Sequence, residues 1–266
     1  MKGRPSFATA LMYTVAIGML VFIAAPLVVT MSLSVSDTMF VAFPPRGFTL
    51  SWFRKVIEDP DFQSALSFSI WLAASATAGA LFLGVPAAFA LVRFPLPGRA
   101  MLRSALLSPL IFPVLITGLA LLQLFSILGW RTVWLNLLLA HILVTSPYVV
   151  RTVSASLMLA DVTLEEAART LGASQWRTFV RITLPQIAPG VAAGSLFAFM
   201  VSFDNYPVSM WLADAANDPM PMLIYRKATG VFDPSVAAMS TLMIGLAIGV
   251  VLILERLVGL RRAMGM

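Results

Sequence analysis

The polar stretch TLEEAARTLGASQWRTFVRITLP, residues 163–185, separates two long apolar runs and decides how the rest of the chain is interpreted. Thr163 and Glu166 have the spacing of a capping box, in which each side chain accepts a backbone N–H at a helix start. A helix is therefore predicted to begin near Leu164. Gly172 is predicted to end it, because glycine adopts the left-handed conformation of a helix C-terminus without steric cost.

Each half of this stretch carries an apolar stripe. In the first half, a stripe at helical spacing lies opposite Glu165 and Arg169 and consists of Leu164, Ala167, Ala168 and Leu171. Ser174 is predicted to cap a second short helix, which Leu184 and Pro185 end. Its stripe consists of Trp176, Phe179, Val180 and Thr183. Two short helices around a glycine elbow cannot bury these stripes alone, so the bilayer, other loops or a groove of another protein must cover them.

The composition indicates an integral membrane protein. Hydrophobic residues make up 59% of the 266 residues and charged residues only 11%, whereas soluble domains carry about 25% charged residues. Cysteine is absent, which excludes disulfides and thiolate metal sites, and His141 is the single histidine. The net charge of +6 is spread between apolar runs without the clustering of a nucleic-acid-binding face.

Six apolar stretches approach or exceed the length of about 20 residues that a membrane-spanning helix needs. They cover approximately residues 8–33, 66–91, 105–128, 133–150, 187–213 and 236–258. The first is too long for a signal-peptide core and is predicted to be retained. No hydrophilic block is long enough to fold separately. We therefore predict one all-α membrane domain over residues 1–266, with a cytoplasmic loop at residues 151–186.

Basic residues predict the orientation. With the N-terminus inside, 12 of the 18 basic residues lie in cytoplasmic segments: Lys2, Arg4, Arg93, Arg99, Arg103, Arg151, Arg169, Arg177, Arg181, Arg256, Arg261 and Arg262. The positive-inside rule then favours two cytoplasmic termini. On the outer side, residues 48–66 fit either a helix lying on the membrane interface or an ordinary packed loop helix.

The polar stretch resembles the EAA loop of bacterial ABC importer permeases. The matching residues are Glu166-Ala167-Ala168, then Gly172, then Ile182-Thr183-Leu184-Pro185, and every position of that pattern is filled. The resemblance implies the six-helix type I importer permease fold in the bacterial inner membrane. It also implies that the elbow is a coupling helix inserted into a cytoplasmic ATPase. Its contact residues would be Glu166, Ala167, Ala168, Leu171, Gly172, Ala173 and Ser174.

The same resemblance implies a set of partners. They are a homologous second permease, two cytoplasmic ATPase subunits and an extracytoplasmic solute-binding protein, besides membrane lipid. The chain contains no G-x-x-x-x-G-K-[ST] loop, so ATP and Mg²⁺ are expected on the ATPase, and no cofactor is expected in this chain. It is predicted to be a transport subunit and not an enzyme.

The fifth span contains a carboxylate, Asp204, between Ser202 and Asn205. An ionised group inside a membrane is costly unless it is hydrated or paired, so these three residues are candidates for the translocation pathway. Alternatively, Asp204 pairs with a charge near the outer surface and fixes packing. Pro207 removes a backbone donor and is expected to bend or open the helix here.

A second resemblance concerns the solute. Ser202-Phe203-Asp204, Met222-Leu223-Ile224-Tyr225 and Phe232-Asp233-Pro234 resemble the second permease subunit of spermidine/putrescine importers. That group commonly carries a second acid directly after the aspartate, where this chain has Asn205. The resemblance therefore implies a small cation or zwitterion. Polyamines, amino-acid derivatives such as opines, thiamine and phosphonates remain open as solutes.

Other classes of protein receive less support. An intramembrane enzyme would use Asp204 or His141, yet neither an H-E-x-x-H nor a G-x-S-x-G motif occurs. A transporter working alone would show internal repeats and several intramembrane charges. A copper site at Met220, Met222, Met239 and Met243 lacks a histidine or cysteine, so packing is the favoured role of these methionines.

Overall fold

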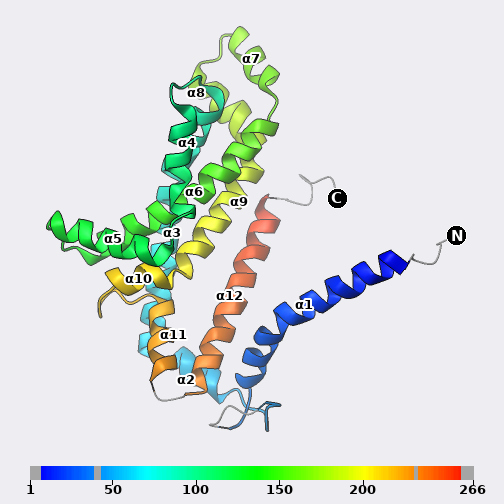
Figure 1. The fold of residues 1–266 in the computed structure, drawn as a ribbon, viewed down its shortest axis with the longest axis vertical. Helices are drawn as coiled ribbons and strands as arrows, with labels where there is room; N and C mark the ends of the chain where they lie inside the picture. The colour runs from blue at the N-terminus through cyan, green and yellow to red at the C-terminus, as the bar shows by residue number, and fades with distance from the viewer. Residues whose placement is uncertain (1–6, 39–42, 231–232, 259–266) are drawn as a thin grey trace. The chain divides into compact units, whose positions relative to one another are not determined.

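The computed structural model describes residues 7–38, 43–230 and 233–258, which form helices without any strand in those ranges (Figure 1). The basic residues Lys2, Arg4, Arg261 and Arg262, and Phe232 of the second resemblance, lie outside the described residues. In chain order the helical elements are α1 (Phe7–Leu33), α2 (Ser51–Glu58), α3 (Pro60–Arg93), α4 (Arg99–Leu107), η1 (Ser108–Leu110), α5 (Val114–Ile127), α6 (Val133–Leu159), α7 (Val162–Thr170), α8 (Gln175–Thr178), η2 (Phe179–Thr183), α9 (Leu184–Phe203), α10 (Tyr206–Leu212), α11 (Met220–Thr229) and α12 (Ser235–Val258).

The described residues form two compact units, one within residues 1–60 and 224–246 and the other within residues 61–223 and 247–266. In the first unit, Val56 of α2 is fully buried, and the Trp52 Nε1–H donates to the Ser36 carbonyl oxygen at 2.8 Å. One face of α2 is therefore packed against protein. Both candidate sites predicted from the sequence lie in the second unit.

The predicted apolar spans correspond to long helices. Five helical segments within the described ranges are long and apolar enough to cross a membrane, and a bent pair of helices makes a sixth candidate. The five segments are Leu11–Leu33, Pro60–Arg93, Val133–Leu159, Gln175–Phe203 and Ser235–Ile253. The mostly helical fold with five to six apolar spans is thus confirmed.

The bent pair replaces the straight helix that residues 105–128 predict. The axes of Arg99–Leu110 and Val114–Ile127 differ by 101°, so α5 turns away from α4 (Figure 1). Pro113 has no N–H to donate and stands as the N-cap of α5. The N–H groups of Ile111 and Phe112 both donate to the Ser108 carbonyl oxygen, which closes the chain into a turn. Apolarity alone did not reveal this break.

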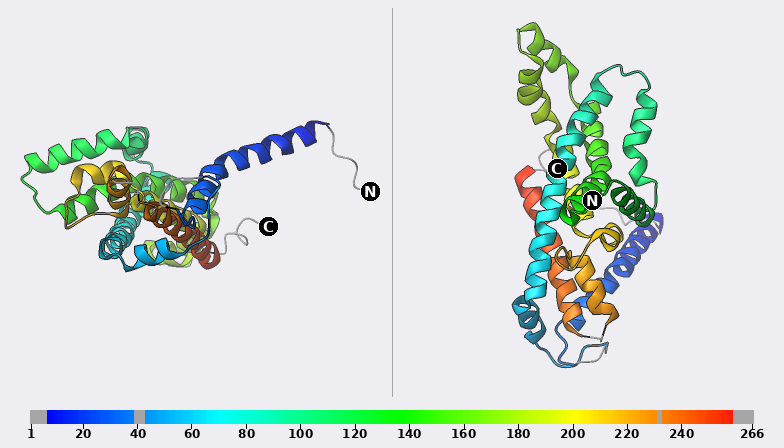
Figure 2. Two further views of the ribbon diagram at one scale, coloured as in Figure 1. Left: turned by 90° about the horizontal axis from the view of Figure 1, so that it is seen from below. Right: turned by 90° about the vertical axis from the view of Figure 1, so that its left-hand side faces the viewer.

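Helices α6 and α9 lie side by side and form the centre of the second unit (Figures 1 and 2). Gly190 and Gly194 of α9 face α6 so closely that a Cβ on Gly190 would lie 2.8 Å from the Thr152 carbonyl oxygen. A Cβ on Gly194 would lie 3.1 Å from the Val149 Cα. Small residues one turn apart allow such close helix packing in membranes, so α9 is held against α6 over several turns.

The second half of the polar stretch does not end where the sequence predicts. The sequence predicts that Leu184 and Pro185 stop the helix, but the π-helical turn η2 carries α8 directly into α9. In this turn the Leu184 N–H donates to the Phe179 carbonyl oxygen, five residues back. Pro185 follows this turn as the second residue of α9 and has no N–H to donate, so the helix continues past it without that one bond. Residues 175–203, from α8 through η2 to α9, are consequently one continuous helix.

Candidate functional site

The N-terminal cap of α7 differs from the prediction. Asp161, not Thr163, is the N-cap: its Oδ1 accepts from the Thr163 Oγ1 at 2.7 Å and from the Thr163 N–H at 2.9 Å. Both bonds hold the pKa of the Asp161 carboxyl below its usual value, and the bond from the Thr163 hydroxyl has the larger effect. The Asp161 N–H also donates to Gln186 Oε1 at 2.9 Å, which ties the loop start to the first turn of α9. Since the cap lies two residues earlier, α7 begins at Val162.

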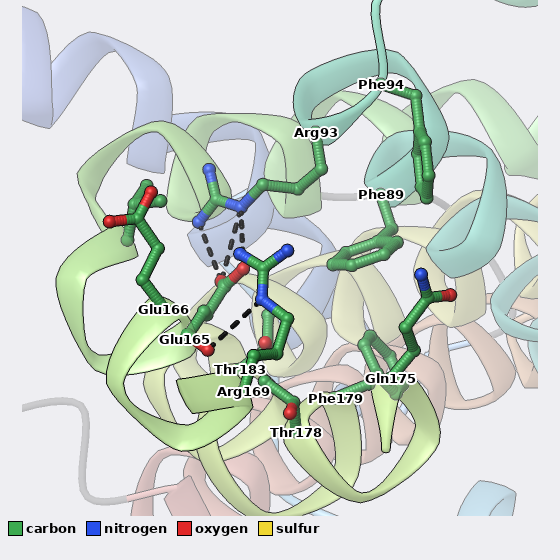
Figure 3. Close-up of a pocket in the computed structure, with 11 residues that line it drawn as sticks. Phe89, Arg93, Phe94, Glu165, Glu166, Arg169, Gln175, Thr178, Phe179 and Thr183 are labelled. Carbon is green, nitrogen blue, oxygen red and sulfur yellow. Dashed lines mark hydrogen bonds and ion pairs between the residues drawn. The ribbon is translucent and has the colours of Figure 1, made fainter. Parts of the chain in front are cut away.

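Glu165 anchors α7 to the end of α3. Its carboxylate is buried (Figure 3). Arg93 Nε donates to Glu165 Oε1 at 3.2 Å and to Oε2 at 3.3 Å, and Arg93 Nη2 donates to Oε1 at 3.0 Å. Arg169 Nε donates to the Glu165 carbonyl oxygen at 3.2 Å. These groups line a cavity of about 250 Å³ between α3, α7 and α8. A bidentate Arg–carboxylate pair has a defined geometry, so it fixes the orientation of α7.

Aromatic contacts anchor the second half of the loop. Phe179 packs edge to face on Phe89 of α3, with ring centroids 5.2 Å apart, and Phe89 makes a similar contact with Phe94 at 5.9 Å. Edge-to-face pairs of this kind add to the stability that burial gives. Part of the second apolar stripe is therefore covered by this chain itself. Trp176 stacks on Phe179 but is 74% exposed.

The elbow between the two helices is a Schellman motif centred on Gly172. Its φ of +83° is in the left-handed region, the Gly172 N–H donates to the Arg169 carbonyl oxygen, and the Ala173 N–H donates to the Ala168 carbonyl oxygen. Ser174 follows as the cap of α8, and its Oγ accepts from the Arg177 N–H at 3.3 Å. The predicted glycine end and serine cap are both confirmed.

The predicted coupling residues lie on the open side of this hairpin. Leu164 and Leu171 are 50% and 88% exposed, and Glu166, Ala167 and Ser174 are exposed as well. Ala168 and Ala173 are half-buried. The hairpin projects beyond the end of the α6–α9 pair (Figures 1 and 2). The first apolar stripe therefore faces outward, while Glu165, which the sequence places opposite the stripe, faces the protein.

The predicted pathway residues lie where α9 ends. The helix stops at Phe203 and restarts at Tyr206, so the opening expected near Pro207 is present. Asn205 is buried, and its Oδ1 accepts from the Val208 N–H at 3.2 Å as the cap of α10. Asp204 is exposed and forms no ion pair within the described ranges. Ser202 and Asn205 therefore lie inside the helix packing, whereas Asp204 faces outward.

His141 joins the two sides of this helix break. It is fully buried on α6; its Nδ1 is 2.8 Å from Ser202 Oγ on α9, and its Nε2 is 3.4 Å from Ser209 Oγ on α10. A single side chain thus connects the helices before and after the break. The sequence places His141 in the fourth span, but it cannot reveal which serines are its partners.

Replacing Ser202 with alanine is expected to destabilise the chain by about 1–3 kcal/mol, because His141 would keep a buried nitrogen without a partner. Thermal unfolding of the purified chain measures this change. Ser195→Ala is the matched control, since Ser195 Oγ donates to the Val191 carbonyl oxygen of its own helix and to no other helix among the described residues. Equal melting temperatures for the two variants would contradict the assigned role of the His141–Ser202 bond.

Sequence comparisons agree with the motif and with the fold. Residues 80–262 match the family described as binding-protein-dependent transport system inner membrane component. The putrescine transport system permease protein PotI of Escherichia coli strain K12 is 32% identical over 237 residues, which cover 86% of this chain and 84% of that protein. The spermidine/putrescine transport system permease protein PotC of the same strain is 30% identical over 207 residues, 78% of each chain.

Solved structures share the fold. A chain of a bacterial ABC transporter involved in the import of the acidic polysaccharide alginate aligns with a TM-score of 0.72 at 18% identity, over 96% of this chain and 98% of that one. A chain of an amino acid ABC transporter aligns with a TM-score of 0.59 at 17% identity, over 81% of this chain and all of the other. The chain belongs to the family of binding-protein-dependent transport system inner membrane components, and it is a multi-pass permease subunit of an ABC importer.

Proposed function

We propose that this permease crosses the membrane six times as one domain, with both termini in the cytoplasm, and forms half of a translocation pathway. A homologous second permease supplies the other half. Two cytoplasmic ATPase subunits bind ATP and Mg²⁺, and an extracytoplasmic binding protein delivers the solute. The bent pair α4–α5 counts as the third span in this scheme.

The observation that carries this proposal is the hairpin of α7 and α8. Its inner side is fixed to α3 through Glu165 and Phe179, while its outer side presents Leu171 and Leu164 without any covering element in the described part of the chain. A rigidly mounted apolar surface suits docking into a groove of a partner. Because η2 joins the hairpin directly to α9, a displacement of the elbow would move the pathway helix as a rigid body.

For the solute we propose a small cation or zwitterion of the polyamine type, such as putrescine or spermidine. Two relatives with about one-third identity are named as putrescine and spermidine/putrescine permeases. Asp204 is an exposed carboxylate at the opening of α9, where it would attract an amine. A permease for an amino-acid derivative, thiamine or a phosphonate is the alternative.

Reconstitution tests this function. The chain, a second permease, an ATPase and a binding protein from neighbouring genes are placed in liposomes, and labelled putrescine is followed. ATP-dependent accumulation that requires every component is the expected result. Accumulation without the ATPase would contradict the importer mechanism. Accumulation of labelled arginine or thiamine but not putrescine would contradict the proposed solute and leave the importer mechanism standing.

Asp204→Asn is expected to lower the uptake efficiency of a cationic solute about tenfold to a hundredfold, because one charge-assisted contact is lost. Uptake and co-purification with the ATPase are measured in parallel. Asp214→Asn is the control, since Asp214 is exposed and bonds only within its own loop, to Ala216 and Asn217. Loss of assembly in Asp204→Asn would instead assign Asp204 to packing.

A further inference from the structure

Two arginines face one cavity that the sites described above do not include. Arg103 of α4 and Arg151 of α6 line a space of about 210 Å³, together with apolar residues and Ser154, and no acidic residue takes part. Across the described ranges, neither guanidinium lies in an ion pair. Both arginines are exposed, and together they place two cationic side chains at the lining of one hollow that has no acidic residue, which favours an anionic group.

An apolar cavity adjoins this basic one. It has a volume of about 340 Å³ and lies between α3, α4 and α6, and Val150 lines both spaces. Its walls are apolar except for Ser146, whose Oγ already donates to the Ile142 carbonyl oxygen at 2.6 Å. We refer to these two neighbouring cavities, which share Val150, as one groove along α4 and α6 with a basic end and an apolar end.

The dimensions of the groove match one half of a bilayer. From Arg151 to Leu139, the far residue of α6 in the apolar cavity, the 12 intervening helical steps span about 18 Å. One leaflet of the hydrocarbon core is about 15 Å thick. An acyl chain that starts at the level of the arginines would therefore end near the far end of the apolar cavity.

We propose that this groove binds an anionic phospholipid of the cytoplasmic leaflet, with its phosphate on Arg103 and Arg151 and one acyl chain in the apolar cavity. The assignment of leaflet rests on the proposed orientation of the chain. Basic pockets between membrane helices on the cytoplasmic side recognise anionic head groups in this way. A cationic solute would be repelled by the two arginines, which separates this groove from the proposed pathway.

The test measures lipid binding by the purified full-length chain in a neutral detergent. Fluorescent phosphatidylglycerol and phosphatidylcholine with identical acyl chains are titrated separately. Phosphatidylglycerol is expected to bind at least about tenfold more tightly, with about fivefold lost for each arginine removed. Arg103→Gln and the double variant Arg103→Gln/Arg151→Gln remove the basic end. Arg99→Gln is the matched control, because Arg99 is exposed on the same helix and lines neither cavity.

A second variant tests the apolar end. Ala105→Phe fills the apolar cavity and leaves both arginines, so it is expected to weaken phosphatidylglycerol binding by about tenfold. Inorganic phosphate at the same concentration is expected not to displace the lipid, since it lacks the acyl chain. Equal binding of the two lipids, an equal loss in Arg99→Gln, or displacement by inorganic phosphate would each overturn the proposal. So would a disulfide from Leu106→Cys to a cysteine in the second permease, because that partner would then occupy the groove.

Discussion

Gly172→Pro is expected to reduce uptake to background while the chain still inserts into the membrane. Proline fixes φ near −65°, whereas Gly172 has φ +83°, and its N–H donates to the Arg169 carbonyl oxygen. The substitution therefore costs about 3 kcal/mol or more at the elbow and removes the Schellman motif. Uptake and binding-protein-stimulated ATP hydrolysis, measured together, should become uncoupled.

Gly129→Pro is the matched control for this variant. Gly129 ends α5 with φ +69° and the same hydrogen-bond pattern, in which Gly129 N–H donates to Ser126 and Trp130 N–H donates to Phe125. The local strain is similar, but the position lies outside the hairpin of α7 and α8. Equal loss of coupling in both variants would show that any damaged helix end has this effect, and would refute a specific role of the elbow.

Arg93→Met is expected to release α7 from α3. The Glu165 side chain is 5% exposed and would lose Arg93, its ion-pair partner among the described residues. Breaking a buried ion pair on one side costs about 3–5 kcal/mol. Backbone amide exchange over residues 162–170 should therefore accelerate about a hundredfold or more. Arg99→Met, which removes an exposed arginine, should leave this exchange unchanged.

The double variant Arg93→Met/Glu165→Met separates two explanations for that result. Replacing both members of a buried ion pair with apolar residues is often neutral, because no charge is left without a partner. Exchange in residues 162–170 should then return close to that of the original chain. If the double variant exchanges as fast as Arg93→Met, the arginine stabilises the loop by some means other than its pairing with Glu165.

Local signals in the sequence predicted the elbow because they depend on neighbouring residues. The glycine end at Gly172 and the cap at Ser174 follow from backbone sterics and short-range hydrogen bonds. The start of α7 was wrong by two residues, because Asp161 and Thr163 are both competent caps and the capping-box spacing favoured the latter. The sequence predicts a stop at Pro185, whereas the π-helical turn η2 carries the helix past this residue.

Long-range contacts account for what the sequence did not reveal. Arg93 and Glu165 are 72 residues apart, and His141 and Ser202 are 61 apart, so no periodicity links them. A signal was nevertheless present for Arg93: it is a lone charge at the end of an apolar run and needs a partner or water. Asp204 and Ser202 are near neighbours in sequence, yet the break after Phe203 directs them to opposite environments.

In the proposed importer, the exposed face of the α7–α8 hairpin contacts the ATPase. The chain has no cysteine, so Leu171→Cys introduces a single thiol at an 88% exposed position. A benzophenone maleimide attached there and irradiated in the assembled transporter should yield a covalent product with the ATPase. Ile127→Cys, 83% exposed at the end of α5, should yield none. An ATPase product from Ile127→Cys and not from Leu171→Cys, or from neither, would contradict docking of the hairpin on the ATPase.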